Sequence, residues 1–194
     1  MATSDASTAD REIVIERTVN APRELVWQAW TEADQIRQWW GPNGFTTTIH
    51  AMDVRVGGVW RFIMHGPDGT DYPNRIVYRE IVKPERLVYD HDDDNDPPSH
   101  SFRSTVTFVA QGCKTKVTLQ VVFASVEARE ASVKFGAVEG GEQTLARLDQ
   151  YLAATPVKGS PAYAWKRSRH GTSADDVFPS RRELLRQTIS ASSA

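Results

Sequence analysis

Residues 101–123 read SFRSTVTFVAQGCKTKVTLQVVF, and this stretch decides the fold. Apolar and polar residues alternate from Ser101 to Ala110 and again from Lys114 to Phe123, which is the period-two pattern of half-buried β-strands. Between the two runs lies Gln111-Gly112, whose composition is typical of a tight turn. The stretch therefore predicts an antiparallel hairpin with one face turned toward a core.

More strands are predicted on the N-terminal side of this hairpin. The β-rich runs are Ile13–Val19, Thr46–Val54, Val59–His65, Asp71–Val82 and Arg86–His91. Short connections such as Gly57-Gly58 and the GPDG sequence at 66–69 separate consecutive runs. Such short turns join antiparallel neighbours, so one antiparallel sheet is expected.

Helical spacing appears on both sides of the predicted sheet. A first short helix is expected from Pro22 to Trp30, and a second begins at Thr31–Asp34 like a capping box and stops at Gly41-Pro42. A long C-terminal helix is expected to start near Val126 or near Val138 and to end at about Ala153. Its sheet-facing stripe would comprise Val138, Gly141, Leu145, Leu148 and Leu152.

These elements predict one α+β domain over 12–154, in which a curved seven-stranded antiparallel sheet wraps around the C-terminal helix. Residues 1–11 are expected to form a flexible arm. Residues 155–194 are expected to form a basic tail with a short helix at 180–189. The tail carries a charge of +4 and the remainder −6, so either docking on the domain or binding of an anionic partner is open.

The composition is that of an ordinary globular protein, with 40% hydrophobic residues, 25% charged residues and a formal net charge of −2. This balance does not indicate a nucleic-acid partner. No apolar run approaches the roughly 20 residues of a membrane span, and no secretory start is recognised, so a cytoplasmic location is expected. The single cysteine, Cys113, excludes an intramolecular disulfide.

Several motifs in a fixed order resemble one known family. They are Ala21-Pro22 with Val26-Trp27, Trp39-Trp40-Gly41-Pro42, DVRVGGVWRF at 53–62, GPDG at 66–69, YREI at 78–81 with PERL at 84–87, and Gln143-Thr144-Leu145 with Leu148. Over about residues 12–153 the chain resembles the homologues of the activator of heat-shock protein ninety ATPase, within the START-like (SRPBCC) superfamily. The resemblance implies the helix-grip fold and a cavity between the long helix and the concave sheet face.

The resemblance does not imply a particular ligand. Stand-alone relatives are mostly thought to hold or process small hydrophobic molecules. ATPase activation is not carried over, because in the eukaryotic co-chaperone the matching domain follows a separate N-terminal domain.

The alternation along each strand selects the residues that would line such a cavity. With the apolar phase turned inward, the candidate ligand-binding residues are Trp39, Trp60, Phe62, Met64, Tyr78, Glu80, Leu87, Tyr89, Val106, Phe108, Leu119, Gly141, Leu145 and Leu148. A mostly apolar wall with a few polar atoms is typical of small-molecule sites. A solid core is the alternative that the same pattern allows. Of the two adjacent tryptophans, at least one is expected to pack on the sheet and the other to lie at the pocket mouth.

Glu80 and Tyr78 are the candidate catalytic residues. If Glu80 faces inward like Tyr78, burial raises the pKa of its carboxyl group and makes it a proton donor or acceptor. The alternative is that Glu80 pairs with Arg61, Arg75 or Arg79.

No metal site and no cofactor are predicted. His50, His65, His91 and His100 lack the close spacing of a zinc site and are expected to be solvated or hydrogen-bonded. The acidic run Asp90–Asp96 does not place glycine and glutamate where a calcium-binding loop requires them, so it is interpreted as a solvated loop.

Three function classes follow. The leading hypothesis is a non-catalytic binding protein for a small apolar or aromatic molecule. The second is a polyketide-cyclase-like enzyme that uses Glu80 with Tyr78 or Tyr89 as acid and base. The third is a co-chaperone-like interaction module; a chaperone partner and a homodimer remain open.

Overall fold

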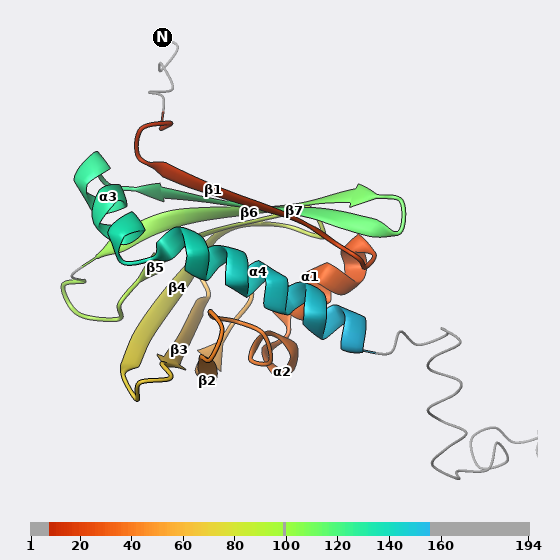
Figure 1. Cartoon of the computed structure of the whole chain (residues 1–194), viewed down its shortest axis with the longest axis horizontal. Coiled ribbons are helices and arrows are strands. Elements are labelled where there is room, and N and C mark those ends of the chain that lie inside the picture. Colours follow the sequence, from red (N-terminus) through yellow and green to blue (C-terminus); the bar gives the residue numbers. More distant parts are fainter. Residues whose placement is uncertain (1–7, 99, 156–194) are drawn as a thin grey trace, which may run out of the picture. The chain divides into compact units, whose positions relative to one another are not determined.

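The structure, a computed structural model, describes residues 8–98 and 100–155 (Figure 1). Most of the predicted arm and nearly all of the predicted tail, with its helix at 180–189, lie outside the described residues. The elements are β1 (Glu12–Val19), α1 (Arg23–Thr31), α2 (Ala33–Ile36), β2 (Thr46–Met52), β3 (Val59–His65), β4 (Asp71–Val82), β5 (Arg86–Asp92), β6 (Ser101–Gln111), β7 (Lys114–Phe123), α3 (Val126–Lys134) and α4 (Ala137–Ala154).

The seven strands form one sheet in the order β1-β7-β6-β5-β4-β3-β2, and all neighbours are antiparallel. The β6–β7 hairpin has the predicted register, with Gln111 opposite Lys114 across a turn where Gly112 has a φ of +64°. Only β1 joins the sheet away from its sequence neighbours, beside β7. The predicted helix-grip fold is confirmed.

Helix α4 runs along one face of the curved sheet (Figure 1). Leu145 and Leu148 on its sheet-facing stripe are fully buried, as the 3.6-residue spacing predicts. At the edge strand, Arg17 forms an ion pair with Asp149 of α4 at 3.2 Å. The face that α4 covers is called here the concave face, and the opposite one the convex face.

The C-terminal helical region is divided into two helices. Phe135-Gly136 separates α3 from α4, and Gly136 has a left-handed φ of +94° that breaks the helical path. Ser125 caps α3 by accepting a hydrogen bond from the Ala128 N–H at 3.2 Å. The start predicted near Val138 is therefore correct for the long helix, while α3 is a separate element without buried residues.

The predicted capping box at Thr31 is wrong. The Thr31 hydroxyl donates backward to the Trp27 carbonyl at 2.9 Å, and Glu32 precedes α2 without a side-chain cap. Tertiary packing therefore holds this short helix, because Ile36 within it is fully buried.

One irregularity in β4 decides which side chains face α4. The pairing with β5 shifts by one residue between Tyr78 and Glu80, which marks a β-bulge. Tyr78 lies opposite Tyr89, whereas Glu80 lies opposite Val88 and Ile81 opposite Leu87. Since residues paired across two strands share a face, Ile81 continues the concave face and Glu80 lies on the convex one.

Gly58 allows the tight connection between β2 and β3. Its carbonyl accepts the Tyr78 N–H at 3.0 Å, and a Cβ at this position would overlap the backbone oxygen of Asp53. We predict that Gly58→Ala lowers the free energy of unfolding by about 2 kcal/mol, because the clash is with backbone. Urea unfolding of the two proteins measures this difference.

The matched control is Gly140→Ala, within α4. A Cβ there meets Pro42 at 3.3 Å, and the helix gains about 1 kcal/mol of intrinsic propensity. Its stability is therefore expected to remain near that of the parent. A Gly58→Ala protein as stable as the Gly140→Ala protein would contradict the proposed role of this turn.

Candidate functional site

A continuous row of rings crosses the concave face and is called here the aromatic track. Neighbouring ring centroids lie 4.2–5.9 Å apart. These separations are typical of favourable aromatic packing. The members of the track, in spatial order, are Trp40, Trp60, Phe62, His91, Phe102 and Phe123.

Trp60 holds an unusual polar group within this track. Its side chain is 1% exposed, and its indole N–H has no hydrogen-bond partner within the described part of the chain. Trp60 stacks on Phe62 with centroids 4.2 Å apart and meets Trp40 edge-on at 5.2 Å. A buried donor without an acceptor costs about 1–3 kcal/mol, so this N–H is prepared for an acceptor.

Two buried tyrosines lie beside Trp60. Tyr78 faces Tyr89 across β4 and β5, and burial raises the pKa of both hydroxyl groups. Tyr89 hydrogen-bonds Ser104, whereas the Tyr78 hydroxyl makes no hydrogen bond with the described residues. Both hydroxyls remain protonated at neutral pH, so Tyr78 offers a second donor to the interior.

His91 contributes an acceptor. Its Nε2 lies 2.8 Å from the Asn74 Oδ1, and the Asn74 amide is oriented by donating from Nδ2 to the Tyr72 carbonyl at 2.6 Å. Since an amide oxygen only accepts, Nε2 must carry the imidazole proton. Burial lowers the pKa of His91 to about 4, with a smaller repulsive effect of His100, so the ring is neutral at pH 7. The lone pair is therefore on Nδ1.

The concave face keeps some exposure at one end. Met64, Tyr72, His91 and Phe102 have the inward strand phase, yet each retains partial exposure, while Trp60 and Phe62 beside them are fully buried. These four residues mark the accessible end of the concave face.

Twelve of the fourteen sequence-predicted lining residues fall into three groups. Trp60, Phe62, Tyr78, Leu87, Tyr89, Val106, Phe108, Leu145 and Leu148 are buried in the core, and Met64 and Leu119 are partly buried against them. Gly141 instead allows a close approach of Ile15 from β1, where a Cβ would clash. A ligand role for each stays a prediction.

The expectation that Glu80 faces inward is wrong. Its carboxylate accepts hydrogen bonds from Arg86 at 2.5 and 3.0 Å on the convex face, and its side chain is 45% exposed. The bulge after Tyr78 reverses the strand phase and turns Glu80 outward. Pairing with an arginine was the alternative expectation, but the partner is Arg86 and not Arg61, Arg75 or Arg79.

The two adjacent tryptophans both contact Trp30 but differ in their other neighbours. Trp39 packs on Trp30 and donates to the Ala29 carbonyl at 3.1 Å, so it lies against α1. Trp40 meets Trp60 and therefore belongs to the concave face. The candidate ligand contact is thus Trp40 in place of Trp39.

Helix α4 holds the loop that follows Trp40. The Arg147 Nη1 donates to the carbonyls of Gly41, Pro42 and Phe45 at 2.8, 2.8 and 3.1 Å. Gln143 accepts the Asn43 N–H at 3.0 Å. These bonds link the loop to the helix beside the aromatic track.

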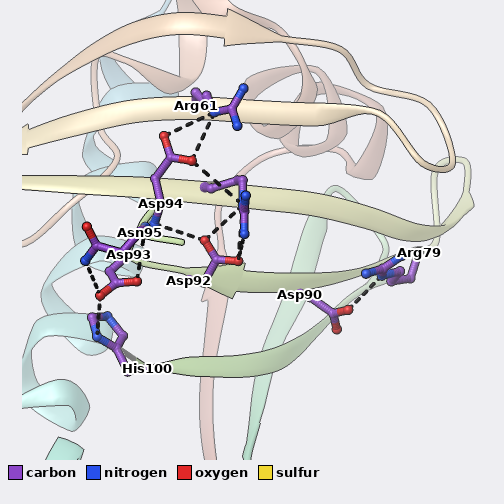
Figure 2. Close-up of polar contacts among 9 residues, drawn as sticks. Arg61, Arg79, Asp90, Asp92, Asp93, Asp94, Asn95 and His100 are labelled. Atoms are coloured by element: carbon purple, nitrogen blue, oxygen red, sulfur yellow. Dashed lines mark hydrogen bonds and ion pairs between the residues drawn. The ribbon is translucent and has the colours of Figure 1, made fainter. Parts of the chain in front are cut away.

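The acidic run is not a solvated loop, which corrects the sequence interpretation. Asp92 and Asp93 are each 8% exposed, and Figure 2 shows Asp94 paired with Arg61. Asp92 receives hydrogen bonds from Arg75 at 2.8 and 3.1 Å. Long-range arginine partners therefore order this run. No group of three or more metal-ligating side chains gathers within residues 8–98 and 100–155.

His65 lies on the convex face. It contacts the Asp71 carboxylate at 2.6 Å and the Thr48 hydroxyl at 2.9 Å. Thr48 and Asp71 are exposed and His65 is half-buried, so the three side chains form a hydrogen-bond chain at the surface. The expectation of a hydrogen-bonded histidine is correct for His65 and for His91.

His91 and Phe102 also face inward, which was not predicted from the sequence. Both continue an alternation that was already visible, since His91 follows Leu87 and Tyr89, and Phe102 precedes Ser104 and Val106 in the same phase. Asn74 could have been found in the same way from Ile76 and Tyr78. Strict use of period two would therefore have identified them.

Comparison with known proteins supports the fold and the family. Residues 20–153 match the family model described as activator of Hsp90 ATPase homolog 1-like protein. No curated protein matches the sequence. Within the described residues, no helix is long and apolar enough to cross a membrane.

Solved structures of several bacterial proteins are similar to this chain. Protein Ms6760 from Mycobacterium smegmatis is 24% identical with a TM-score of 0.69, over 78% of this chain and 96% of that one. A protein from Arthrobacter aurescens is 23% identical with a TM-score of 0.71, over 81% and 95%. The AHSA1 protein from Silicibacter pomeroyi is 20% identical with a TM-score of 0.59, over 73% and 97%. At these identities the likeness concerns the fold alone.

His91 makes the stability of the protein depend on pH. Its pKa is about 4 in the folded state against an ordinary value near 6.5, so the unfolded chain binds more protons between these limits. This contribution to stability is complete above about pH 6.5 and is lost as the pH falls toward 4; its full size is about 3 kcal/mol. We predict that His91→Gln reduces the loss of unfolding free energy between pH 7 and pH 4.5, measured with urea.

The control is His50→Gln, because His50 lies on an exposed position of β2. The carboxylates titrate equally in all three proteins, so the difference between variants isolates the imidazole. If His91→Gln and the parent lose the same stability between the two pH values, His91 is not held neutral by burial.

Proposed function

The chain belongs to the family of activator of Hsp90 ATPase homolog 1-like proteins, and from this premise we propose that it binds a small planar apolar molecule on the concave face. The ligand lies against the aromatic track and presents an acceptor atom to the Trp60 N–H. The binding is non-catalytic.

The unpartnered indole N–H of Trp60 is the observation that carries this proposal. A buried tryptophan in this fold can find a hydrogen-bond acceptor: the Trp39 N–H donates to the Ala29 carbonyl, whereas the Trp60 N–H has no acceptor among the described residues. An acceptor on a ligand would recover the cost of the unmade bond, about 1–3 kcal/mol. A purely structural core residue at this position would gain more from phenylalanine, which has no N–H to satisfy.

The surroundings of Trp60 support a flat and apolar ligand. Trp60 and Phe62 are inclined by only 26°, and the partly exposed Phe102 and Met64 extend the apolar wall. Small-molecule sites typically combine such a wall with few polar atoms. The flexible thioether of Met64 is suited to adjusting around a ligand.

The alternative function, acid–base catalysis, required Glu80 as an inward-facing base, and Glu80 does not face inward. Glu80 is ion-paired with Arg86 on the convex face. Burial raises the pKa values of Tyr78 and Tyr89, which makes them hydrogen-bond donors at neutral pH and poor proton acceptors. Binding therefore accounts for the interior better than a polyketide-cyclase-like reaction does.

Docking on a chaperone, which the family description brings to mind, has no specific support. On the convex face Arg75 pairs with Asp92, and Arg79 and Arg103 both pair with Asp90. These charges therefore pair with one another. A co-chaperone role and a homodimer are therefore not proposed.

The proposal is tested with 2-methoxynaphthalene, a neutral planar probe with one acceptor oxygen. We predict that the parent protein binds it and that Trp60→Phe weakens binding 3- to 10-fold, the value of about one hydrogen bond. Isothermal titration calorimetry measures the Kd. Naphthalene, which has no acceptor, should bind the parent and Trp60→Phe proteins equally.

Trp27→Phe is the matched control, because Trp27 is a buried tryptophan that packs on Phe108 away from the track. It should leave the Kd for 2-methoxynaphthalene unchanged. Absence of binding of both probes to the parent would overturn the proposed function. Equal weakening in the Trp27→Phe and Trp60→Phe proteins would remove Trp60 from the site.

A further inference from the structure

We propose that His91 selects ligands that carry a neutral hydroxyl group, of which a phenol is the simplest aromatic example. The hydroxyl donates to the His91 Nδ1, so that phenols bind more tightly than their ethers or the parent hydrocarbons. This inference rests on the proposed function and names the class of ligand for the same concave face.

A hydrogen-bond chain through Asn74 fixes the orientation and the tautomer of the His91 imidazole. The Tyr72 carbonyl accepts from the Asn74 Nδ2 at 2.6 Å, and the Asn74 Oδ1 lies 2.8 Å from the His91 Nε2. This chain assigns the proton to Nε2 and leaves Nδ1 as an acceptor. Within the described residues no hydrogen bond reaches Nδ1.

His91 lies within the aromatic track, where a ligand on the concave face would contact it. Its ring lies 5.9 Å from the ring of Phe62 and 4.7 Å from that of Phe102, between two members of the aromatic track. His91 is also partly exposed, whereas Trp60 is not. A flat ligand against the track therefore meets Nδ1 near the accessible end.

The two polar groups suit a ligand of about two fused rings. Trp60 lies opposite Ile76, and Ile76 lies opposite His91, so the two residues are separated by two strand spacings. Each spacing is about 4.8 Å, which places the Trp60 and His91 backbones about 10 Å apart. Side chains that reach inward from both strands leave a shorter span between the donor of Trp60 and the acceptor of His91.

The charge of the surroundings favours a neutral donor. Asn74, Phe62 and Phe102, which contact the His91 ring, are uncharged, and the titratable groups that act on it are His100 and Asp92. The neighbouring Asp92 is engaged by Arg75. Burial of an ammonium group against this apolar wall would cost far more than burial of a hydroxyl that makes its hydrogen bond.

The test compares 6-methoxy-2-naphthol with 2,6-dimethoxynaphthalene at pH 7.5. Each has a methoxy oxygen that can accept from the Trp60 N–H at one end, and only 6-methoxy-2-naphthol has a hydroxyl that donates at the other end, so the ratio of the two Kd values measures the contribution of the donor. We expect 6-methoxy-2-naphthol to bind about 3- to 10-fold more tightly to the parent protein, the value of one neutral hydrogen bond. Protonated 2-(aminomethyl)-6-methoxynaphthalene should bind more weakly than 6-methoxy-2-naphthol.

His91→Phe keeps a ring in the track and removes Nδ1. It should reduce the ratio to about one, and binding of 2,6-dimethoxynaphthalene is measured alongside to give the ratio. Asn74→Leu removes the acceptor that holds the Nε2 proton, so it should lower the ratio because both tautomers become populated. Circular dichroism confirms that both variants are folded.

The outcomes separate the two proposals. If 2,6-dimethoxynaphthalene binds and 6-methoxy-2-naphthol binds no better, or if the ratio survives in the His91→Phe protein, the selective role of His91 is wrong and the proposed function stands. If the amine binds most tightly, the ligand class is cationic and the inference is overturned. If no probe, including naphthalene, binds the parent, the proposed function and this inference both fail.

Discussion

The contact between Trp40 and Trp60 joins the helical segment after β1 to the strands at the opposite edge of the sheet. The two rings lie 5.2 Å apart, although twenty residues separate them in sequence. Such aromatic pairs contribute about 0.5–1.5 kcal/mol beyond the area that they bury. Arg147 adds a second link, because it binds the loop after Trp40 through three carbonyls. Helix, loop and sheet thus meet where the candidate site lies.

The bulge in β4 determines which polar groups face the candidate site. Without the extra residue Glu80 would follow Tyr78 onto the concave face, and the interior would contain an ionisable carboxylate. With the bulge, that charge pairs with Arg86 outside. The polar groups that the described interior offers along the aromatic track include those of Trp60, Tyr78 and His91. An uncharged interior of this kind suits binding better than proton transfer.

The strand pattern predicted the sheet and much of its concave face. Period two along β6 and β7 identified Val106 and Phe108 as buried, and helical spacing identified Leu145 and Leu148. These assignments succeed because burial on one face imposes its period directly on the sequence. The same reasoning would have found His91, which shares the phase of Leu87 and Tyr89.

Other features depend on partners far away in the chain. Nothing local to Glu80 reveals the bulge, and nothing local to Asp92 reveals Arg75 as its partner. Trp39 and Trp40 have different environments because Trp39 donates to the Ala29 carbonyl, whereas Trp40 packs on Trp60. Both partners lie far from the pair in the sequence. The proton on the His91 Nε2 depends on Asn74, which lies in another strand. Sequence spacing alone contains none of these geometries.

The indole N–H signal of Trp60 gives the most direct test of where a ligand binds. In an ¹⁵N–¹H correlation spectrum, assigned with the Trp60→Phe protein, this signal should move downfield when 2-methoxynaphthalene is added, because the N–H gains an acceptor. The indole signal of Trp27 should stay in place. A Trp60 signal that does not move while the probe binds would contradict a ligand site on the aromatic track.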